Sequence, residues 1–513
     1  MMRLIDNALN TITMYRLTLY FLIALLGLAV VESLFGLIPG GPLAIVATTA
    51  VLLAVCFLVN AAIARIMKIR SNPESSLITA LILALISGPV SLTGDPRHIV
   101  ALVLAGVVAI ASKYLLALRK QHLFNPAAVG ALFSGLVFGD YASWWVGNLA
   151  LLPLVVVGGF LLVRRISRLR LIGVFLLAFS VFMVCLGAAQ GLGPDLILQS
   201  LAFVFAHSSL LFFAAVMFTE PMTSPKRFPW QVAYALVVAL LYQPQLQLFG
   251  GNLTPEEALL IGNLLSFIVS PSYKLRLALK ERTTVARETL AFTFPKPPGF
   301  THRVGQFMEW TLPVAKGDGR GERRYFSIAS SPTEKDILVA ARFSPNPSQY
   351  KRAMAAMTPG STITAGELGG DFTLPKNPAL PLAFIAGGIG ITPFRSMIKY
   401  LVDTDQRRDV VLLYSNNAED EIAFGDLFDE ARHKIGLKAI YTLTDTSRIC
   451  QGWCGERGLI DADMIRRGVP GIGSRLFFIS GPPAMVNAMK GTLRSLGVPR
   501  GRIRSDYFPG YQS

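Results

Sequence analysis

The distribution of long apolar segments constrains this chain more than any other feature. Spanning the hydrocarbon core of a bilayer takes about 20 apolar residues, and segments of roughly that length occur only before about residue 272. They run approximately over 17–37, 43–64, 76–93, 98–117, 126–139, 146–163, 171–190, 199–218, 231–249 and 257–271. This pattern predicts an all-α membrane domain over residues 1–272, with about ten transmembrane helices, fused to a globular region.

The basic residues are distributed unevenly among the loops between these segments. The formal net charge is +16, and nucleic acid is the partner that such a charge first suggests. Lys and Arg are concentrated in every second loop, with Arg97 as the exception, as the positive-inside rule expects. We therefore predict a lipid membrane as partner and no nucleic acid. The alternation predicts a multi-pass protein of a bacterial-type cytoplasmic membrane, with both termini and the globular region in the cytoplasm.

Three polar clusters interrupt the apolar pattern on the predicted cytoplasmic side. They are Ser71–Ser76, Lys120–Pro126 and Thr219–Lys226. Each could simply cap a helix, because Ser, Thr, Asn and Pro are common at helix ends. Two of them also place a carboxylate near a membrane boundary, which favours a bound ligand. The candidate ligand contacts are Ser76, Asn125, Thr219, Glu220 and Thr223.

Two of these clusters carry a family resemblance. Asn125-Pro126-Ala127 and Thr219-Glu220-Pro221 make residues 60–275 similar to a pair of paralogous membrane proteins, the B-type component of the Na⁺-translocating NADH:quinone reductase and the D-type component of the Rnf complex. The resemblance implies ten helices in two inverted repeats of five and a flavin in the membrane. That family attaches FMN covalently through a Ser-Gly-Ala-Thr loop, whereas the corresponding loop here is Gly139–Trp145. We therefore expect a non-covalent FMN or other flavin. Trp144 and Trp145 could stack on a flavin or a quinone, but we favour a role as interfacial anchors.

Other redox groups and metals are disfavoured by the residues available. A bis-His haem needs two histidines at one membrane depth, whereas His98, His122 and His207 fall at different predicted depths. Cys450 and Cys454 form a single C-x₃-C pair, and a structural metal site needs about four ligands. No metal site is expected.

The chain after residue 272 has two patterns in succession. Residues 273–283 are treated as a linker. Short alternating segments over 284–378 predict a small antiparallel β-barrel. From 379 to 513, apolar strands alternate with glycine turns and helices, which predicts a doubly wound α/β domain.

Four motifs of this region point to flavin and nucleotide chemistry. Arg324–Ser330 has the form Arg-x-aromatic-Ser, and the two-residue period of a strand places Arg324 and Phe326 on one side. Gly387–Pro393 follows an apolar strand and begins a helix, which is an arrangement that binds phosphate. Ser480–Met485 follows another apolar strand, and Asp506–Tyr511 lies at the C-terminus.

In this order and spacing the four motifs resemble the ferredoxin–NADP reductase family over about 230 residues. The resemblance implies a FAD barrel and a nucleotide domain. It assigns Ser327 and Ser480 to the hydride-transfer site. Phe326 replaces the usual Tyr, and Ser480 replaces a frequent Cys. The implied cofactor contacts are Arg324, Tyr325, Phe326, Ser327, Gly369, Gly370, Phe372 and Phe508 for the flavin, and Gly387, Gly388, Gly390, Thr392, Pro393, Gly481, Pro482 and Pro483 for the nucleotide.

The segment after the second strand of the nucleotide domain bears on the choice between NADH and NADPH. NADP-specific sites usually offer Ser and Arg to the 2′-phosphate here. This chain has Asn417 where the Arg would be, followed by Glu419 and Asp420, and no Lys or Arg occurs between Ser415 and Arg432. We therefore expect NADH to be preferred, although the two carboxylates could equally cap a helix.

The sequence as a whole predicts a fused electron-transfer enzyme. Hydride from NAD(P)H would pass to FAD, and electrons would then pass to a membrane flavin and on to a quinone, an outward acceptor or a redox partner protein. The alternative is a reductase anchored or sensed by a transporter-like membrane domain that carries no redox group. A ratio of two flavins per chain would support the first hypothesis, and one per chain would support the second.

Overall fold

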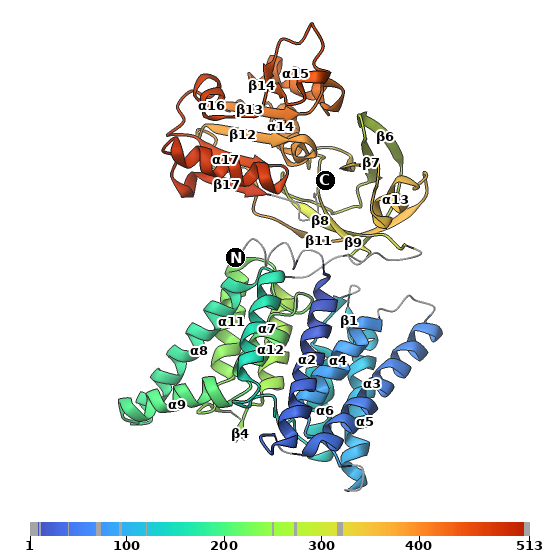
Figure 1. Cartoon of the computed structure of the whole chain (residues 1–513), viewed down its shortest axis with the longest axis vertical. Helices are drawn as coiled ribbons and strands as arrows, with labels where there is room; N and C mark the ends of the chain where they lie inside the picture. The colour runs from blue at the N-terminus through green and yellow to red at the C-terminus, as the bar shows by residue number, and fades with distance from the viewer. Residues whose placement is uncertain are drawn as a thin grey trace. The chain divides into compact units, whose positions relative to one another are not determined.

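The computed structural model (Figure 1) describes residue 9 and residues 12–38, 40–67, 73–91, 95–118, 121–248, 251–270, 274–314 and 322–506. The chain divides into two compact units. Unit 1 comprises Met1–Tyr273 and unit 2 comprises Lys274–Ser513.

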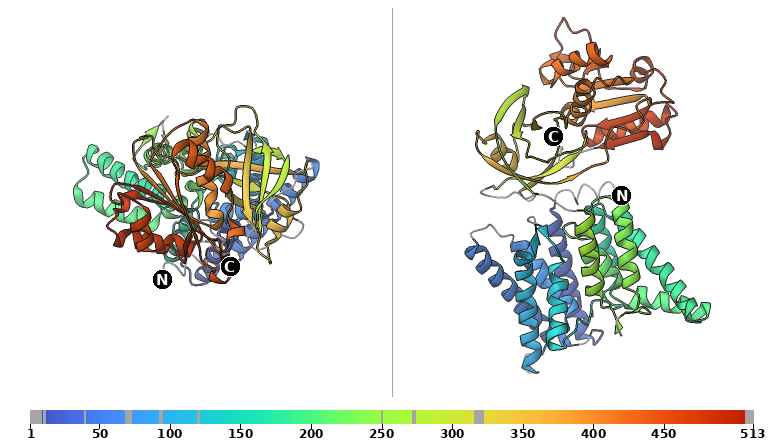
Figure 2. Two further views of the ribbon diagram at one scale, coloured as in Figure 1. Left: turned by 90° about the horizontal axis from the view of Figure 1, so that it is seen from above. Right: turned by 180° about the vertical axis from the view of Figure 1, so that it is seen from behind.

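Unit 1 is a bundle of helices (Figures 1 and 2). Each apolar segment predicted from the sequence contains a helix. Several helices begin at a proline, such as Pro126 and Pro255, which suits the first turn because the missing N–H is not needed there. The helices are α2 (Met14–Leu34), α3 (Gly41–Ile66), α4 (Pro73–Ile86), α5 (Pro96–Leu115), α6 (Pro126–Phe138), α7 (Leu152–Arg165), α8 (Leu169–Ala189), α9 (Pro194–His207), α10 (Leu210–Phe212), the π-helix η1 (Phe213–Phe218), α11 (Phe228–Leu241) and α12 (Pro255–Val269). Strand β1 (Ala117–Leu118) pairs antiparallel with β2 (Gln121–His122), and β3 (Gln247–Leu248) pairs antiparallel with β4 (Gly251–Asn252).

The helices of unit 1 differ in their capacity to cross a bilayer. Among the described residues, 4 helices are long and apolar enough, namely α2, α3, α5 and α8, and the bent pair α9 with α10–η1 makes up to 5. Helices α4, α6 and α11 are apolar but have only 13 or 14 residues, or about 20 Å at 1.5 Å per residue, against a hydrocarbon core of about 30 Å. The structure thus contains several helices compatible with membrane insertion, while the expected number of about ten spans is not established by helix length.

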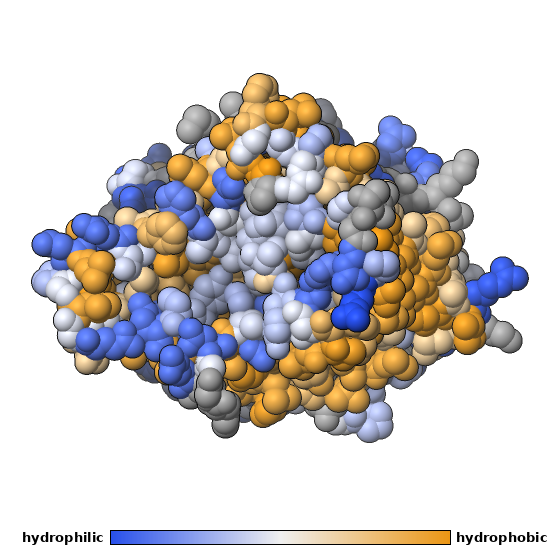
Figure 3. All heavy atoms as spheres, turned by 90° about the horizontal axis from the view of Figure 1, so that it is seen from below, coloured by the Kyte–Doolittle hydropathy of each residue, from blue (hydrophilic) through white to orange (hydrophobic). Residues whose placement is uncertain are grey.

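Large apolar side chains project outward from unit 1. Leu43, Ile66 and Leu115 are 77%, 80% and 80% exposed, and extensive apolar areas are visible in Figure 3. Soluble monomers rarely expose contiguous apolar surface of this kind. These exposed side chains are compatible with membrane insertion.

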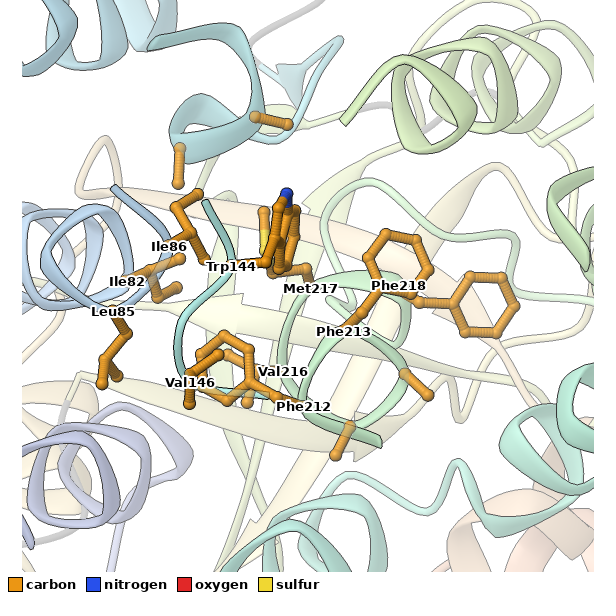
Figure 4. Close-up of a cluster of buried hydrophobic side chains, with 14 of the residues drawn as sticks. Ile82, Leu85, Ile86, Trp144, Val146, Phe212, Phe213, Val216, Met217 and Phe218 are labelled. Atoms are coloured by element: carbon orange, nitrogen blue, oxygen red, sulfur yellow. The ribbon is translucent and has the colours of Figure 1, made fainter. Parts of the chain in front are cut away.

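The centre of unit 1 is an aromatic core in which the chain between α6 and α7 meets η1 (Figure 4). Trp144 packs edge-on against Phe213, with ring centroids 5.9 Å apart. Its indole N–H donates to Glu256 Oε2 at 3.0 Å, and the Trp145 N–H donates to the Ala84 carbonyl at 2.9 Å. The expectation that both tryptophans are interfacial anchors is wrong. They are 7% and 9% exposed, because internal acceptors satisfy their N–H groups and allow burial.

The first part of unit 2 contains two antiparallel sheets. The sheet orders are β10-β7-β6 and β5-β11-β8-β9. The strands are β5 (Leu275–Ala278), β6 (Glu281–Ala286), β7 (Thr289–Pro295), β8 (Phe307–Thr311), β9 (Arg323–Ser327), β10 (Asp336–Arg342) and β11 (Thr362–Gly369), and helix α13 (Gln349–Ala355) precedes β11. Strand β5 and the start of β6 lie within the segment treated as a linker. Leu277 there is buried and its neighbours are exposed, so this segment belongs to the sheet.

The second part of unit 2 is a six-stranded parallel sheet in the order β15-β14-β13-β12-β16-β17. Along β12, Leu382 and Phe384 pack on one face with α14 and α15, whereas Ala383 and Ile385 pack on the other with α16 and α17. Burial on both faces explains why the strand is continuously apolar. The elements are β12 (Leu382–Gly387), η2 (Gly388–Ile391), α14 (Thr392–Asp403), β13 (Val410–Asn416), η3 (Glu419–Glu421), α15 (Gly425–Ile435), β14 (Lys438–Leu443), η4 (Thr446–Arg448), β15 (Glu456–Arg457), α16 (Ala462–Gly468), β16 (Leu476–Ser480), α17 (Pro483–Ser495), η5 (Arg500–Arg502) and β17 (Ile503–Asp506).

Candidate functional site

Two of the predicted motifs meet where the strand order of the parallel sheet reverses. β12 lies between β13 and β16, so the turns after β12 and β16 lie side by side at the carboxyl edge. Ligands of doubly wound sheets bind in the crevice at this position. A Cβ on Gly390 would lie 2.4 Å from the Ser480 carbonyl oxygen, and one on Gly387 would lie 2.2 Å from Met485 Sδ. These two glycines therefore allow the close approach of the two turns.

The middle glycine has a different environment. Gly388 has a φ of +51°, and a Cβ there would meet no atom within 4 Å. It lines a pocket with Asn416 and Glu421 of the nucleotide domain and with Arg287 and Arg342 of the barrel. Both guanidinium groups are paired with carboxylates, Arg287 with Asp420 at 3.4 Å and Arg342 with Glu421 at 3.2 Å. The feature of this pocket that suits a phosphate is therefore the open backbone of Gly388 at the turn before a helix.

The remaining residues predicted for the nucleotide lie around the same turn. The Thr392 hydroxyl donates to the Ile389 carbonyl at 3.2 Å, which ties the start of α14 to the glycine turn. Pro393 occupies the first turn of α14. Gly481 packs directly on Gly387, Pro482 lies beside it, and Pro483 begins α17.

The two serines assigned to hydride transfer have buried hydroxyls that fit a bound ligand. Ser327 is 3% exposed and Ser480 is 0% exposed. Within the part of the chain that the structure describes, neither Oγ has a hydrogen-bond partner. A buried hydroxyl without a partner costs free energy, on the order of 1–3 kcal/mol. A flavin at Ser327 and a nicotinamide at Ser480 would each supply polar atoms.

The residues of the predicted flavin motif alternate between the two faces of β9. Arg324 and Phe326 pair with Trp310 and Met308 of β8, so all four side chains point to one face. The Arg324 guanidinium lies 5.1 Å from the centroid of the Tyr350 ring, and the Phe326 ring lies 6.1 Å from it. The predicted alignment of Arg324 with Phe326 is confirmed.

Tyr325 lies on the opposite face of β9. Its hydroxyl is 2.9 Å from Glu367 Oε2 and 3.2 Å from Glu309 Oε2. Burial raises the pKa of Glu309, and the Arg323 guanidinium opposes this increase. Tyr325 is therefore held by two carboxylates, which sequence reasoning did not foresee.

The other predicted flavin contacts, Gly369, Gly370 and Phe372, lie in different parts of unit 2. Gly370 has a φ of +106°, and a Cβ there would lie 3.1 Å from the Phe307 ring. It follows Gly369, the last residue of β11. Phe372 is buried in the nucleotide domain, with ring centroids 5.7 Å from Phe394 and 5.1 Å from Phe478. Phe508, the last predicted flavin contact, lies outside the described residues.

Both polar atoms of the Asn417 side-chain amide form hydrogen bonds. Its nitrogen donates to Glu421 Oε2 at 3.1 Å, and its oxygen accepts from the Thr444 hydroxyl at 3.1 Å. Arg448, which follows β14, approaches the same loop and pairs with Asp420 at 2.9 Å and Glu421 at 3.1 Å. Sequence reasoning missed Arg448 because it searched only the segment between Ser415 and Arg432.

The predicted ligand residues of unit 1 fall into two groups. Asn125, Thr219 and Glu220 line a cavity of about 80 Å³, which is larger than one water needs. The Asn125 amide donates to Glu220 Oε2 at 2.8 Å, and the Thr223 hydroxyl donates to the same oxygen at 3.1 Å. Ser76 and Thr223 do not line the cavity. The Ser76 hydroxyl is buried and donates to the Pro73 carbonyl.

Lys113 and Ser75 also line this cavity. Lys113 of α5 is 7% exposed, and its ammonium donates to the Ser75 carbonyl at 2.8 Å and to the Ser75 hydroxyl at 3.1 Å. Lys113 was not among the predicted ligand contacts, but a lysine at the end of an apolar segment was the signal that could have identified it.

The cysteine pair is part of a loop rather than of a metal-binding cluster. The Cys450 thiol donates to Glu419 Oε2 at 2.6 Å, and this hydrogen bond raises the pKa of the thiol. Among the described residues, no group of three or more His, Cys, Asp and Glu side chains could hold a metal ion.

Comparison with known proteins identifies unit 2. The family model described as Oxidoreductase NAD-binding domain matches residues 384–491. NADH-cytochrome b5 reductase 1 of Ajellomyces capsulatus is 29% identical over 255 residues, which cover 46% of this chain and 79% of that protein. The C-terminal region is a FAD/NAD-binding module of the ferredoxin–NADP/cytochrome b5 reductase family. The chain is an NAD(P)H-dependent oxidoreductase.

Two other relatives of this reductase module are similar over comparable shares of the chain. Stachydrine N-demethylase reductase subunit Stc4 of Rhizobium meliloti is 28% identical over 238 residues, covering 45% of this chain and 66% of that protein. Among solved structures, the cytochrome b5 reductase domain of Ulva prolifera nitrate reductase is 20% identical with a TM-score of 0.40, covering 45% of this chain and 97% of that chain.

Proposed function

We propose that this NAD(P)H-dependent reductase oxidises NADH at unit 2 and passes the electrons to a flavin in unit 1. From there they would continue to a quinone, an outward acceptor or a redox partner protein. The observation that carries the proposal is the cavity of unit 1, where Lys113 and Glu220 face one space inside an apolar helix bundle. The concentration of Lys and Arg in every second loop supports a location of unit 2 in the cytoplasm of a bacterial-type cell.

Within unit 2 the protein contributes mainly position. Bound FAD supplies the redox chemistry, since it accepts a hydride and releases single electrons. Arg324 and Ser327 would hold the flavin, and the glycine turn with the open backbone of Gly388 would hold the nucleotide phosphates. The Ser480 hydroxyl would meet the carboxamide end of the nucleotide. Hydride transfer needs no protein acid or base, so the alignment set by these residues would supply most of the catalysis.

The helices around the cavity support a binding site in unit 1. Counted from α2 among the helical segments that the structure describes, α4 is the third and the bent pair α9 with α10–η1 is the eighth, with a bend of 63° in the pair. These positions correspond if the segments form two repeats of five, as the resemblance to the membrane proteins of the Rnf and sodium-pumping complexes implies. Short or broken helices at corresponding positions of two repeats are a frequent mark of binding sites.

The polar groups of the cavity favour a flavin over a quinone as its ligand. Glu220 Oε2 accepts from Asn125 and Thr223, and Oε1 has no donor among the described residues. Lys113 uses two of its three protons on Ser75. The cavity therefore offers an acceptor as well as a donor. The pyrimidine ring of a flavin presents an N–H beside carbonyl oxygens, whereas a quinone presents acceptors only.

Flavin content tests this proposal. Purified protein in detergent should contain two flavins per chain, and acid precipitation should release both, because no covalent attachment motif is present. Glu220→Ala should bind the second flavin about tenfold more weakly, because one charge-assisted contact is lost. The purified variant should therefore lose this flavin. Glu256→Gln is the matched control, because Glu256 is also buried in unit 1 but does not line the cavity.

The same measurement examines the rival function. A reductase anchored or sensed by a redox-inactive membrane domain would contain one flavin per chain. One flavin in the unmodified protein, with full retention in the Glu220 variant, would favour the rival. Flavin that stays on the denatured polypeptide would contradict non-covalent binding.

A further inference from the structure

The loop after β9, which we call the flavin strand, is hydrogen-bonded to α14. This helix follows the Gly387–Gly390 turn, which we call the nucleotide turn. This loop comprises Ala329–Glu334, and we refer to it as the 329–334 loop. Its backbone carbonyls are the main contact points. Arg395 of α14 donates to the Ala329 carbonyl at 2.9 Å, and the Ser396 hydroxyl donates to the Ser330 carbonyl at 2.7 Å. Arg395 also forms a two-pronged ion pair with Glu334, with one N···O distance of 2.9 Å.

The barrel holds the same loop from another side. His302 Nε2 lies 3.1 Å from the Ser330 carbonyl, and since a carbonyl only accepts, Nε2 must carry the proton. Burial lowers the pKa of His302, which favours the neutral ring. Lys296 donates to the Pro332 and Glu334 carbonyls, each at 2.8 Å. The loop is thus fixed to the barrel and to α14 together.

These contacts are close in sequence to both cofactor turns. Ser330 comes three residues after Ser327, and Arg395 comes five residues after Gly390. Ser330 is 1% exposed and Ser396 is 0% exposed, so water does not compete for their hydrogen bond. The contacts therefore form a short rigid connection between the strand that would hold the flavin and the turn that would hold the nucleotide.

We propose that Arg395, Ser396 and His302 are positioning residues that set the separation between the flavin strand and the nucleotide turn. Hydride transfer requires the donor carbon and acceptor nitrogen to lie roughly 3–3.5 Å apart, and a misplacement of about 1 Å can lower the rate about a hundredfold. Neither Arg395 nor Ser396 needs to touch a cofactor for this effect. The connection acts on the rate of transfer rather than on the affinity for either cofactor.

Stopped-flow reduction of the full-length protein tests the proposal. Arg395→Ala should lower the rate constant of flavin reduction by NADH about tenfold, while the Kd values for FAD and NAD⁺ change less than about twofold. Arg395→Lys should recover part of the rate, because one donor to the loop remains. Amide hydrogen exchange of residues 328–335 should accelerate in Arg395→Ala even without nucleotide, which is independent of turnover.

Arg475→Ala is the matched control. Arg475 is 3% exposed, pairs with Asp409 at 2.6 Å and donates to the Leu382 carbonyl, at the opposite end of β12. It should lower stability but leave the rate of flavin reduction unchanged. Ser396→Ala provides a second variant if Arg395→Ala does not fold, with a smaller rate loss expected. An unchanged rate in Arg395→Ala or Ser396→Ala, an equal loss in the control, or a loss confined to nucleotide affinity would overturn the proposal.

Discussion

Arg324→Ala should release FAD from the purified protein. The Arg324 guanidinium lies on β9 beside Tyr350, on the same strand as Ser327, whose buried hydroxyl has no partner among the described residues. A charge-assisted contact between arginine and a pyrophosphate is worth about 1.5–3 kcal/mol. We therefore expect FAD binding to weaken roughly ten- to a hundredfold. Flavin absorbance and fluorescence after gel filtration would measure the loss.

The neighbouring arginine provides the control for this prediction. Arg323 points to the opposite face of β9, where its guanidinium lies 3.5 Å from Glu309. Arg323→Ala removes the same charge from the same strand, so an effect of net charge or of strand stability would appear in both variants. We expect Arg323→Ala to retain FAD. If Arg324→Ala retains it as well, Arg324 is not the cation that binds the flavin pyrophosphate.

The sequence predicted those features of unit 2 that depend on neighbouring residues. The run from Leu382 to Ala386 is apolar throughout because the strand is buried on both faces, and Gly387–Gly390 follows because two turns pack closely there. Both signals are local in the chain. The facing of Arg324 and Phe326 likewise follows from the two-residue period of a strand.

Features that depend on distant residues could not be predicted in the same way. Arg342 of the barrel lines the pocket above Gly388, and Arg448 pairs with Asp420 and Glu421. No short motif connects these arginines to the glycine turn. The contacts of Arg395 with the Ala329 carbonyl and the Glu334 side chain join residues that are 66 and 61 positions apart in the chain.

In unit 1 the sequence predicted where the helices lie, but not which of them are long enough to span a membrane. Apolar content identifies a buried or lipid-facing helix, but it does not separate a complete span from a short helix such as α4, whose residues are mostly buried. Trp144 was interpreted as a surface anchor because its acceptor, Glu256, lies 112 residues further along the chain. Asn125 and Glu220 were noticed because each belongs to a polar cluster between apolar segments, and the capping alternative also applies to Asn125, whose side chain accepts from the Ala128 N–H at the start of α6.

NADH should be the preferred nucleotide, with a kcat/KM roughly ten- to a hundredfold above that for NADPH. A 2′-phosphate near Asn417 would meet Asp420 and Glu421, and Arg448, which approaches this loop, already pairs with both carboxylates. Loss of one charge-assisted contact to the phosphate is worth about 1.5–3 kcal/mol, which corresponds to that ratio. Steady-state rates with both nucleotides and ferricyanide as acceptor would measure it.

Substitution of Asn417 separates the role of charge from that of loop structure. Asn417→Arg adds a cation where NADP-specific relatives of this fold carry one, so the ratio of kcat/KM values should shift towards NADPH by about tenfold or more. Asn417→Ala removes the hydrogen bonds to Glu421 and Thr444 without adding charge. It should lower kcat/KM for both nucleotides alike and leave their ratio unchanged. A higher kcat/KM for NADPH in the unmodified protein would refute the preference, and an equal shift of the ratio in both variants would show that loop disorder, rather than the missing cation, determines it.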